Sequence, residues 1–244
     1  MMKRFMSVML LPAVAMVLAG TTSAVAGDNG VVKGKVIFDG NKSRFKRKKI
    51  KTEKDPKCKQ IKPKGIGSYD VILNTKTAPI TVRNVLVSVK SGLSGGDWPV
   101  PSESVVITQK GCEYKPHVFG IMEGQKLKIV NGDTTNHNIH FLPKVNEEMN
   151  FSQPKQGMEK LVELVKEAPF PMKCDVHPWM KAYCQVFDHP FFAVTGKDGT
   201  FEIPNLPAGK YVIEAWHETF GTQTFEVEVA TGQTVEKDFT FSPK

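Results

Sequence analysis

Short apolar runs separated by turn residues dominate the chain. Residues 30–40 read GVVKGKVIFDG, residues 78–92 read APITVRNVLVSVKSG, and residues 124–133 read GQKLKIVNGD. In the KLKIV part of the last run, polar and apolar residues alternate, which is the period of a strand with one buried face. Short strands at regular spacing, with Gly, Pro, Asn or Asp between them, are typical of sandwiches and barrels. The pattern therefore predicts an all-β fold.

One segment is compatible with a helix. Residues 157–168 read GMEKLVELVKEA, and four of their apolar residues recur at helical spacing: Met158, Leu161, Val162 and Val165. The segment is short, and short apolar runs do not separate helix from strand by periodicity. Both interpretations stay open for it.

Two stretches divide the chain into parts. Residues 91–104, SGLSGGDWPVPSES, concentrate Gly, Ser and Pro and are typical of a connection. A second break falls at FDHPFF, after which the turn signals KDG and PAG alternate with strand-like runs. We expect an N-terminal part at residues 27–102, a middle domain at residues 103–188 and a C-terminal part at residues 189–244.

The first 26 residues have the features of a secretory signal peptide. Lys3 and Arg4 precede an apolar run at residues 5–19, and Ala-Val-Ala provides the small residues that signal peptidase requires before Gly27. A membrane anchor is the alternative, but about 15 apolar residues are few for a bilayer. We expect a periplasmic or otherwise extracytoplasmic protein, which makes nucleic acid an improbable partner.

Positive charge is concentrated in one segment. Residues 42–64 contain twelve Lys and Arg against only Glu53 and Asp55, whereas the whole chain has a net charge of +8. Such a run is often a solvated, mobile arm. The alternative is an electrostatic arm that steers an acidic partner protein or an anionic membrane surface.

The residues MKCDVHPWMKAYC at 172–184 place three soft or intermediate metal ligands close together. Cys174, His177 and Met180 follow one another at a spacing of three, so one short loop can present all of them inwards. Thiolate, imidazole and thioether together suit copper better than magnesium, calcium or manganese. A fourth ligand must come from elsewhere, and His137 in NGDTTNHNIHF is the candidate.

These two motifs carry a family resemblance. EGQKLKIVNGDTTNHNIHF followed by CDVHPWM resembles the cupredoxins, the small blue copper proteins, and the amicyanin type most of all. The resemblance implies a Greek-key β-sandwich with one type 1 copper site. It makes His137, Cys174 and His177 the three close ligands and Met180 a weak axial ligand.

The same resemblance implies roles around the ligands. Asn138 is expected to join the ligand loops by hydrogen bonds, Pro178 to stiffen the loop, and Trp179 to shield it from water. Electrons are expected to pass through an exposed edge of His177. His140 lies three residues after the first ligand, on the other face of a strand, and is expected to support or pack against the site.

The other three histidines are expected to be structural. They are His117, His189 and His217. A second metal site built from His189 and His217 is the alternative.

The four cysteines can pair in three ways, and their spacing does not choose among them. Cys174 must be a free thiolate if it binds copper. We predict a disulfide between Cys58 and Cys112, which joins the basic segment to the middle domain and leaves Cys184 reduced. A Cys112–Cys184 disulfide is the alternative.

The flanking parts resemble a second family. TGKDGTFEI, NLPAGKY and VATGQTVEKDFTF are similar to the second half of carboxypeptidase regulatory-like domains, which are transthyretin-like β-sandwiches. The first half of such a domain opens with a Gly-x-Val strand, and residues 30–40 look like it. Our hypothesis is that residues 30–95 and 190–243 form one sandwich, with the copper domain inserted in a loop. Three modules in series are the alternative.

A filled type 1 site leaves no room for a substrate, so the resemblance implies a one-electron carrier rather than an enzyme. The partner is expected to be a redox protein such as a cytochrome or dehydrogenase, with an acidic surface. Two alternatives remain: a copper storage or delivery protein, and a non-redox binding module in which copper is structural.

Overall fold

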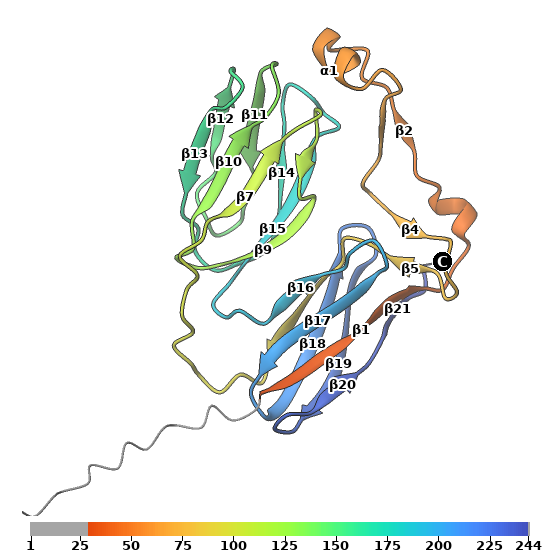
Figure 1. Ribbon diagram of the computed structural model, residues 1–244, viewed down its shortest axis with the longest axis vertical. Helices are drawn as coiled ribbons and strands as arrows, with labels where there is room; N and C mark the ends of the chain where they lie inside the picture. The colour runs from red at the N-terminus through yellow and green to blue at the C-terminus, as the bar shows by residue number, and fades with distance from the viewer. Residues whose placement is uncertain (1–28, 244) are drawn as a thin grey trace, which may run out of the picture.

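The computed structural model describes residues 29–243, and these residues form two β-sandwiches joined by connecting segments (Figure 1). The predicted all-β fold class, with two sandwiches, is confirmed. No helix among the described residues has the length and apolarity that a bilayer crossing requires. The predicted signal peptide at residues 1–26 lies outside the described residues.

The first sandwich combines strands from both ends of the chain. The central strand of one sheet, β1 (Gly30–Phe38), pairs with β17 (Thr200–Leu206), β20 (Thr234–Glu236), β21 (Phe239–Phe241) and β5 (Thr81–Val82), which pairs in turn with β4 (Leu73–Asn74). The other sheet has the order β16 (Phe192–Val194), β6 (Leu86–Ser91), β18 (Gly209–His217) and β19 (Gly221–Val229).

Alternating burial along β1 explains how this sandwich closes. Val32, Val36 and Phe38 are buried, while the residues between them are less buried. They join a core that receives side chains from both sheets, including Val87, Ile213 and Phe241. The apolar period of two therefore places one face of each sheet in a shared core.

The second sandwich is formed by the middle of the chain. One sheet has the order β13 (Glu159–Val162), β10 (Leu127–Asn131), β7 (Val105–Gln109) and β8 (Tyr114–Lys115). The other has the order β12 (Asn150–Gln153), β11 (His137–Phe141), β14 (Glu167–Lys173), β15 (Lys181–Phe187) and β9 (Val118–Met122).

The helical interpretation of residues 157–168 is wrong. This segment forms β13 and the start of β14, and β13 pairs antiparallel with β10. Val162 and Leu164 are buried, whereas Leu161 and Val165 are exposed, so burial follows a period of two. Hydrogen bonds to β10 outweighed the weak helical periodicity.

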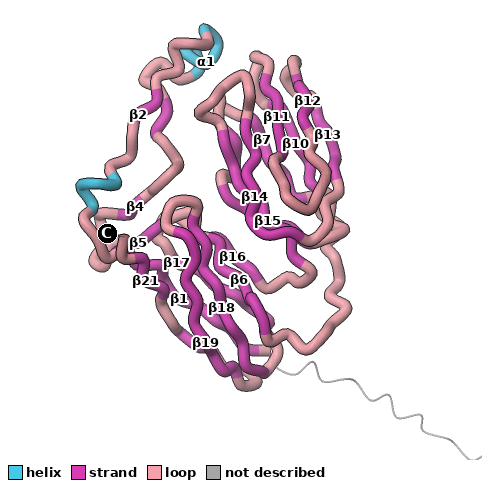
Figure 2. Tube along the Cα trace, turned by 180° about the vertical axis from the view of Figure 1, so that it is seen from behind, coloured by secondary structure: helices cyan, strands magenta, loops and turns pink. Residues whose placement is uncertain are grey.

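The basic segment belongs to an arm, residues 39–72, that leaves the first sandwich after β1 and returns at β4 (Figure 2). The arm contains η1 (Lys42–Phe45), β2 (Lys49–Ile50), α1 (Pro56–Ile61) and β3 (Ile66–Gly67), and β2 pairs with β3. Asp55 is the N-cap of α1, and Pro56 occupies the first turn. Ile66 and Cys58 are buried in the core of the second sandwich, so the arm reaches across to that sandwich.

The two sandwiches contact each other through a small apolar cluster and a polar network. Leu86 of the first sandwich packs with Val118 and Phe187 of the second. Beside them, Glu218 bonds His117 and Lys181, the latter at 2.6 Å. The polar groups at this interface are therefore paired rather than buried alone.

Candidate metal centre

One end of the second sandwich brings the predicted ligand residues together. His137 is the first residue of β11, while Cys174 and His177 lie in the loop between β14 and β15. That loop is closed by two backbone hydrogen bonds: Met180 N–H donates to the His177 carbonyl at 2.8 Å, and Cys174 N–H donates to the Met180 carbonyl at 3.0 Å. The short loop thus turns its side chains towards β11.

Three ligand atoms converge in a buried space. The Nδ1 atoms of His137 and His177 are 3.0 Å apart, and Cys174 Sγ lies 3.6 Å from His177 Nδ1. All three ligand atoms lie within 4.8 Å of one another, and each residue is at most 1% exposed. Metal–nitrogen and metal–sulfur bonds measure about 2.0–2.3 Å, so ligands of one ion lie roughly 3–4 Å apart. The spacing fits a single ion.

Met180 and Asn138 complete the surroundings of the cluster. Met180 is 1% exposed and packs in the same core as Cys174. Asn138 Oδ1 accepts hydrogen bonds from Cys174 Sγ at 3.2 Å and from the Asp175 N–H at 2.8 Å, and its Nδ2 donates to Asn150 at 2.8 Å. The side chain of Asn138 therefore joins β11 to the loop that carries Cys174.

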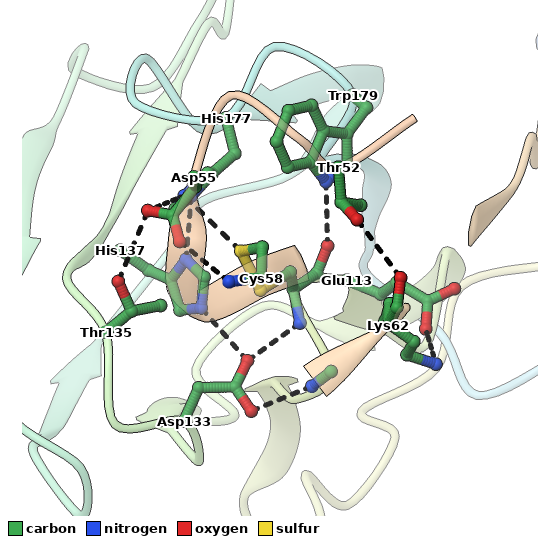
Figure 3. Close-up of a disulfide and its surroundings, with 12 residues drawn as sticks. Thr52, Asp55, Cys58, Lys62, Glu113, Asp133, Thr135, His137, His177 and Trp179 are labelled. Atoms are coloured by element: carbon green, nitrogen blue, oxygen red, sulfur yellow. Dashed lines mark hydrogen bonds and ion pairs between the residues drawn. A yellow bond between two sulfur atoms is a disulfide. The ribbon is translucent and has the colours of Figure 1, made fainter. Parts of the chain in front are cut away.

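Each histidine of the cluster also bonds a carboxylate through its other ring nitrogen (Figure 3). Nε2 of His137 lies 3.0 Å from Asp133 Oδ2, and Nε2 of His177 lies 3.1 Å from Asp55 Oδ2. Asp133 further accepts the N–H groups of Gly111 at 2.9 Å and Cys112 at 2.7 Å. The two carboxylates therefore fix both imidazoles through the ring nitrogens that face away from the cluster, as is usual for metal-bound histidines.

The pKa values of these groups favour their charged forms. Burial opposes the ionisation of Asp133, but hydrogen bonds from His137 and two backbone N–H groups outweigh it and lower its pKa to about 2. Burial is likewise outweighed at Asp55, where hydrogen bonds from Cys58 and His177 lower the pKa. At Cys174, burial opposes ionisation, yet hydrogen bonds from the His177 side chain and from the Asn138 backbone outweigh it and lower the pKa. A lowered thiol pKa favours the thiolate, which is the form that binds metals.

Two other groups of close ligand atoms share residues with this cluster. One combines Asp55, Cys58 and His177, and the other combines Cys112, Asp133 and His137. Both depend on a cysteine that forms the disulfide, and a disulfide sulfur is no thiolate ligand. The group with Cys174 is the one that retains a free thiol.

The predicted disulfide between Cys58 and Cys112 is confirmed. It attaches α1 to the second sandwich, and Cys58 Sγ lies 3.5 Å from Nε2 of His177. The alternative pairing with Cys184 does not form: Cys184 is a free, buried thiol, and burial raises its pKa well above the usual value.

The expectation of an exposed His177 edge is wrong. His177 is 1% exposed, because Asp55 and the disulfide cover its Nε2 side (Figure 3). Trp179 packs on the imidazole with ring centroids 5.1 Å apart and donates from Nε1 to the Cys112 carbonyl at 3.1 Å. Pro178 is exposed at the tip of the loop. The arm therefore closes the side on which the sequence predicted access.

The remaining histidines bond protein groups outside the cluster. His140 bonds Asp175 at 3.0 Å and Glu148 at 2.7 Å near the surface. Nε2 of His189 lies 3.0 Å from the Val89 carbonyl, and Nδ1 of His217 accepts the N–H of the second residue after it at 3.1 Å. In the described chain, the metal-compatible groups include neither His189 nor His217.

The two carboxylates were missed by the sequence analysis. Asp133 precedes His137 by four residues, a spacing that lets one turn bring the two side chains together, so a local signal was available. Asp55 is 122 residues from His177. Its sequence shows only a helix N-cap followed by Pro, and nothing there indicates where that helix docks.

Comparison with known proteins gives partial matches to two kinds of domain. The model of the carboxypeptidase regulatory-like domain matches residues 186–242. A solved structure of an amicyanin mutant in the reduced state is 18% identical, with 41% of this chain and 98% of that chain covered and a TM-score of 0.32. A Cu-containing nitrite reductase (NirK) from Thermus scotoductus SA-01 is 21% identical, with 40% of this chain and 25% of that chain covered and a TM-score of 0.31.

The chain thus spans about a quarter of that nitrite reductase. The search of curated proteins gave no match. The resemblances predicted from the sequence, to cupredoxins and to carboxypeptidase regulatory-like domains, are the ones that these comparisons find.

Proposed function

We propose that this protein holds one copper ion between His137, Cys174 and His177, with Met180 as a weak axial ligand, and carries single electrons. The proposal rests above all on the two Nδ1 atoms that face each other. An ionised carboxylate only accepts hydrogen bonds, so Asp133 and Asp55 require the proton of each imidazole to sit on Nε2. When both imidazoles are neutral, their Nδ1 lone pairs then point at one another across 3.0 Å.

Two facing lone pairs repel each other unless a cation lies between them. That cation can be a shared proton or a metal ion. The adjacent thiol of Cys174 makes the three side chains suitable for a soft metal ion. Two imidazoles, a thiolate and a nearby thioether are the donor set typical of blue copper centres. Bound copper supplies a centre that cycles between its two oxidation states.

The protein residues keep the donor set fixed while the charge on the centre changes. Asn138 holds the Cys174 loop, and the two carboxylates hold the imidazoles. Burial of all three ligand residues excludes water. A dry, fixed set of donors changes little between oxidation states, which favours electron transfer over binding and turnover of a substrate. We therefore propose a carrier rather than an enzyme.

The surroundings support a periplasmic or otherwise extracytoplasmic carrier. A disulfide is stable in an oxidising compartment. The proposed division is a sandwich of residues 27–102 and 189–244 that carries the copper domain of residues 103–188. Lys54, Lys57 and Lys59 lie exposed on the arm near the centre. They suit an acidic redox partner in a weak, salt-sensitive encounter.

The test is copper(II) titration of the mature protein. We expect one equivalent to produce an intense blue thiolate-to-copper absorption that bleaches on reduction and returns on oxidation. The Cys174→Ser variant should lack this band. Cys184→Ser is the matched control, because it removes the other buried free thiol and should leave the band intact. Colourless binding, or a band that persists in Cys174→Ser, would refute the proposal.

Copper storage or delivery is the second candidate, and the closure of the site favours it. His177 is covered by the arm, so a protein partner does not reach the imidazole directly. A storage protein is expected to bind copper(I) without a reversible blue state. The same titration, followed through several cycles of reduction and oxidation, separates the two functions.

A further inference from the structure

The arm delivers a carboxylate to the metal centre from outside the second sandwich. We call residues 52–62 the cap, because this segment carries Asp55 and Cys58, which cover His177 (Figure 3). The cap belongs to the arm, which starts and ends in the first sandwich. Three contacts fix it on the second sandwich: the Cys58–Cys112 disulfide, the Asp55–His177 hydrogen bond, and an ion pair between Lys62 and Glu113 at 2.8 Å.

Both oxygens of Asp55 are used as acceptors. Oδ1 accepts the Cys58 N–H at 2.7 Å and so caps α1, while Oδ2 faces Nε2 of His177 at 3.1 Å. Thr135 Oγ1 lies 3.5 Å from the same Oδ2. A carboxylate can accept on both sides at once. An asparagine offers one acceptor oxygen and one NH₂ donor. It can therefore accept a hydrogen bond from the helix N–H or from the imidazole N–H, but not from both with separate oxygens.

The contact with Asp55 decides which nitrogen of His177 carries the proton. In the neutral imidazole, an Nε2–H that donates to Asp55 leaves the Nδ1 lone pair free to point towards His137 and Cys174. If an amide NH₂ faced Nε2 instead, Nε2 would have to accept, and the proton would move to Nδ1. The ligand nitrogen would then be blocked.

We propose that Asp55 is a positioning residue of the copper centre: delivered by the disulfide-anchored cap, it sets the tautomer of His177 and adds a negative charge behind that imidazole. The proposal rests on the proposed function and adds the arm of the other sandwich to the copper site. A negative charge near an ion favours its more positive oxidation state. Asp55 therefore strengthens binding of copper(II) more than binding of copper(I).

The test compares two substitutions on the same arm. Asp55→Asn removes the double acceptor. Glu53→Gln is the matched control, because it removes the same charge two residues away, from an exposed side chain that pairs with exposed Lys59 at 3.2 Å. We expect Asp55→Asn to weaken copper(II) binding by roughly 10- to 100-fold, the usual effect of losing a hydrogen-bond partner of a metal-bound histidine. Glu53→Gln should bind as the wild type does.

Three readouts separate positioning from general structural damage. Competition titration with a chelator gives the copper(II) and copper(I) affinities. A tenfold larger loss for copper(II) than for copper(I) raises the reduction potential by about 59 mV. Nitrogen-15 NMR of the metal-free protein reports the tautomer, and we expect the Nε2–H form of His177 in the wild type and its loss in Asp55→Asn.

A second variant keeps the test valid if Asp55→Asn disturbs α1. The double variant Cys58→Ala/Cys112→Ala retains Asp55 but releases the cap, and we expect it to weaken copper(II) binding in the same direction. Equal affinities, potentials and tautomers in Asp55→Asn and Glu53→Gln would overturn the inference. If the wild type itself forms no blue complex, the proposed function fails instead, and the two failures are thus distinct.

Discussion

The two histidines of the candidate metal centre are buried alike, but their carboxylate partners differ in origin. Asp133 is four residues from His137, in the turn that leads into β11, and it is 3% exposed. Asp55 comes from an arm of the other sandwich, and its side chain is 21% exposed. The carboxylate partner of His137 thus comes from a neighbouring turn of the same sandwich. The carboxylate partner of His177 depends on a long connection and a disulfide.

The His137–Asp133 pair thus belongs to the second sandwich alone, whereas the His177–Asp55 pair also requires the arm of the first sandwich. The Asp133 side depends on a tight turn with two backbone N–H bonds to the carboxylate. The Asp55 side depends on a helix of six residues, which is too short to be stable alone. Changes that release the arm should therefore alter the His177 side and leave the His137 side in place.

Removal of the disulfide should have the largest effect on stability. The bond closes a loop with a sequence separation of 54 residues, so its loss should cost about 3–4 kcal/mol in the free energy of unfolding. Urea unfolding of metal-free wild type and Cys58→Ala/Cys112→Ala measures this cost. A loss below about 1 kcal/mol would mean that the arm is held without its covalent link.

His217 is a buried histidine that bonds backbone N–H groups instead of a carboxylate, so its burial should make the stability depend on pH. His217 is 1% exposed, and burial lowers its pKa from 6.5 to about 4. Between these values the unfolded chain binds the proton and the folded chain does not, so stability should fall as the pH drops from 6.5 to 4. The full difference corresponds to about 3 kcal/mol.

The measurement is the free energy of unfolding at several pH values in that window. The His217→Asn variant keeps an acceptor near the backbone N–H groups and removes the titrating ring, so its stability should depend less on pH. An unchanged slope in this variant would show that His217 is not the source.

The sequence predicted what is local in this molecule. Strand periodicity in KLKIV and GVVKGKVIF was sufficient for β10 and β1, because alternating burial is encoded by the residues themselves. The loop that carries Cys174 and His177 was also recognisable, since its ligands are three residues apart. With Cys174 set aside as a thiolate, three cysteines remained, and the pairing predicted among them, Cys58 with Cys112, is the one that forms.

What the sequence did not predict depends on docking. The basic segment has the composition of a solvated arm, yet two of its residues, Thr52 and Cys58, are buried. Its lysines other than Lys62 remain exposed, while Asp55, one of its two acidic residues, turns towards His177. A local sequence pattern does not indicate a contact between residues 122 positions apart. The burial of His177 beneath the arm was therefore not predictable from the sequence.

Asparagine substitutions at the two carboxylates should have unequal effects on the metal-free protein. In Asp133→Asn, the new NH₂ group faces a buried N–H donor, which should cost about 2–3 kcal/mol. In Asp55→Asn, the helix cap is retained, because Asn caps helices about as well as Asp, and the cost should stay below about 1 kcal/mol. Urea unfolding of both variants checks this order. Equal losses in the free energy of unfolding would show that Asp55 stabilises the metal-free protein as much as Asp133 does.

X-ray absorption at the copper edge of the copper-loaded wild type identifies the atoms that bind the ion. We expect one copper ion bound to two imidazole nitrogens and one short sulfur, from His137, His177 and Cys174. Loss of the short sulfur in Cys174→Ser, but not in Cys184→Ser, would assign it. A copper ion bound by nitrogen and oxygen alone would contradict the account.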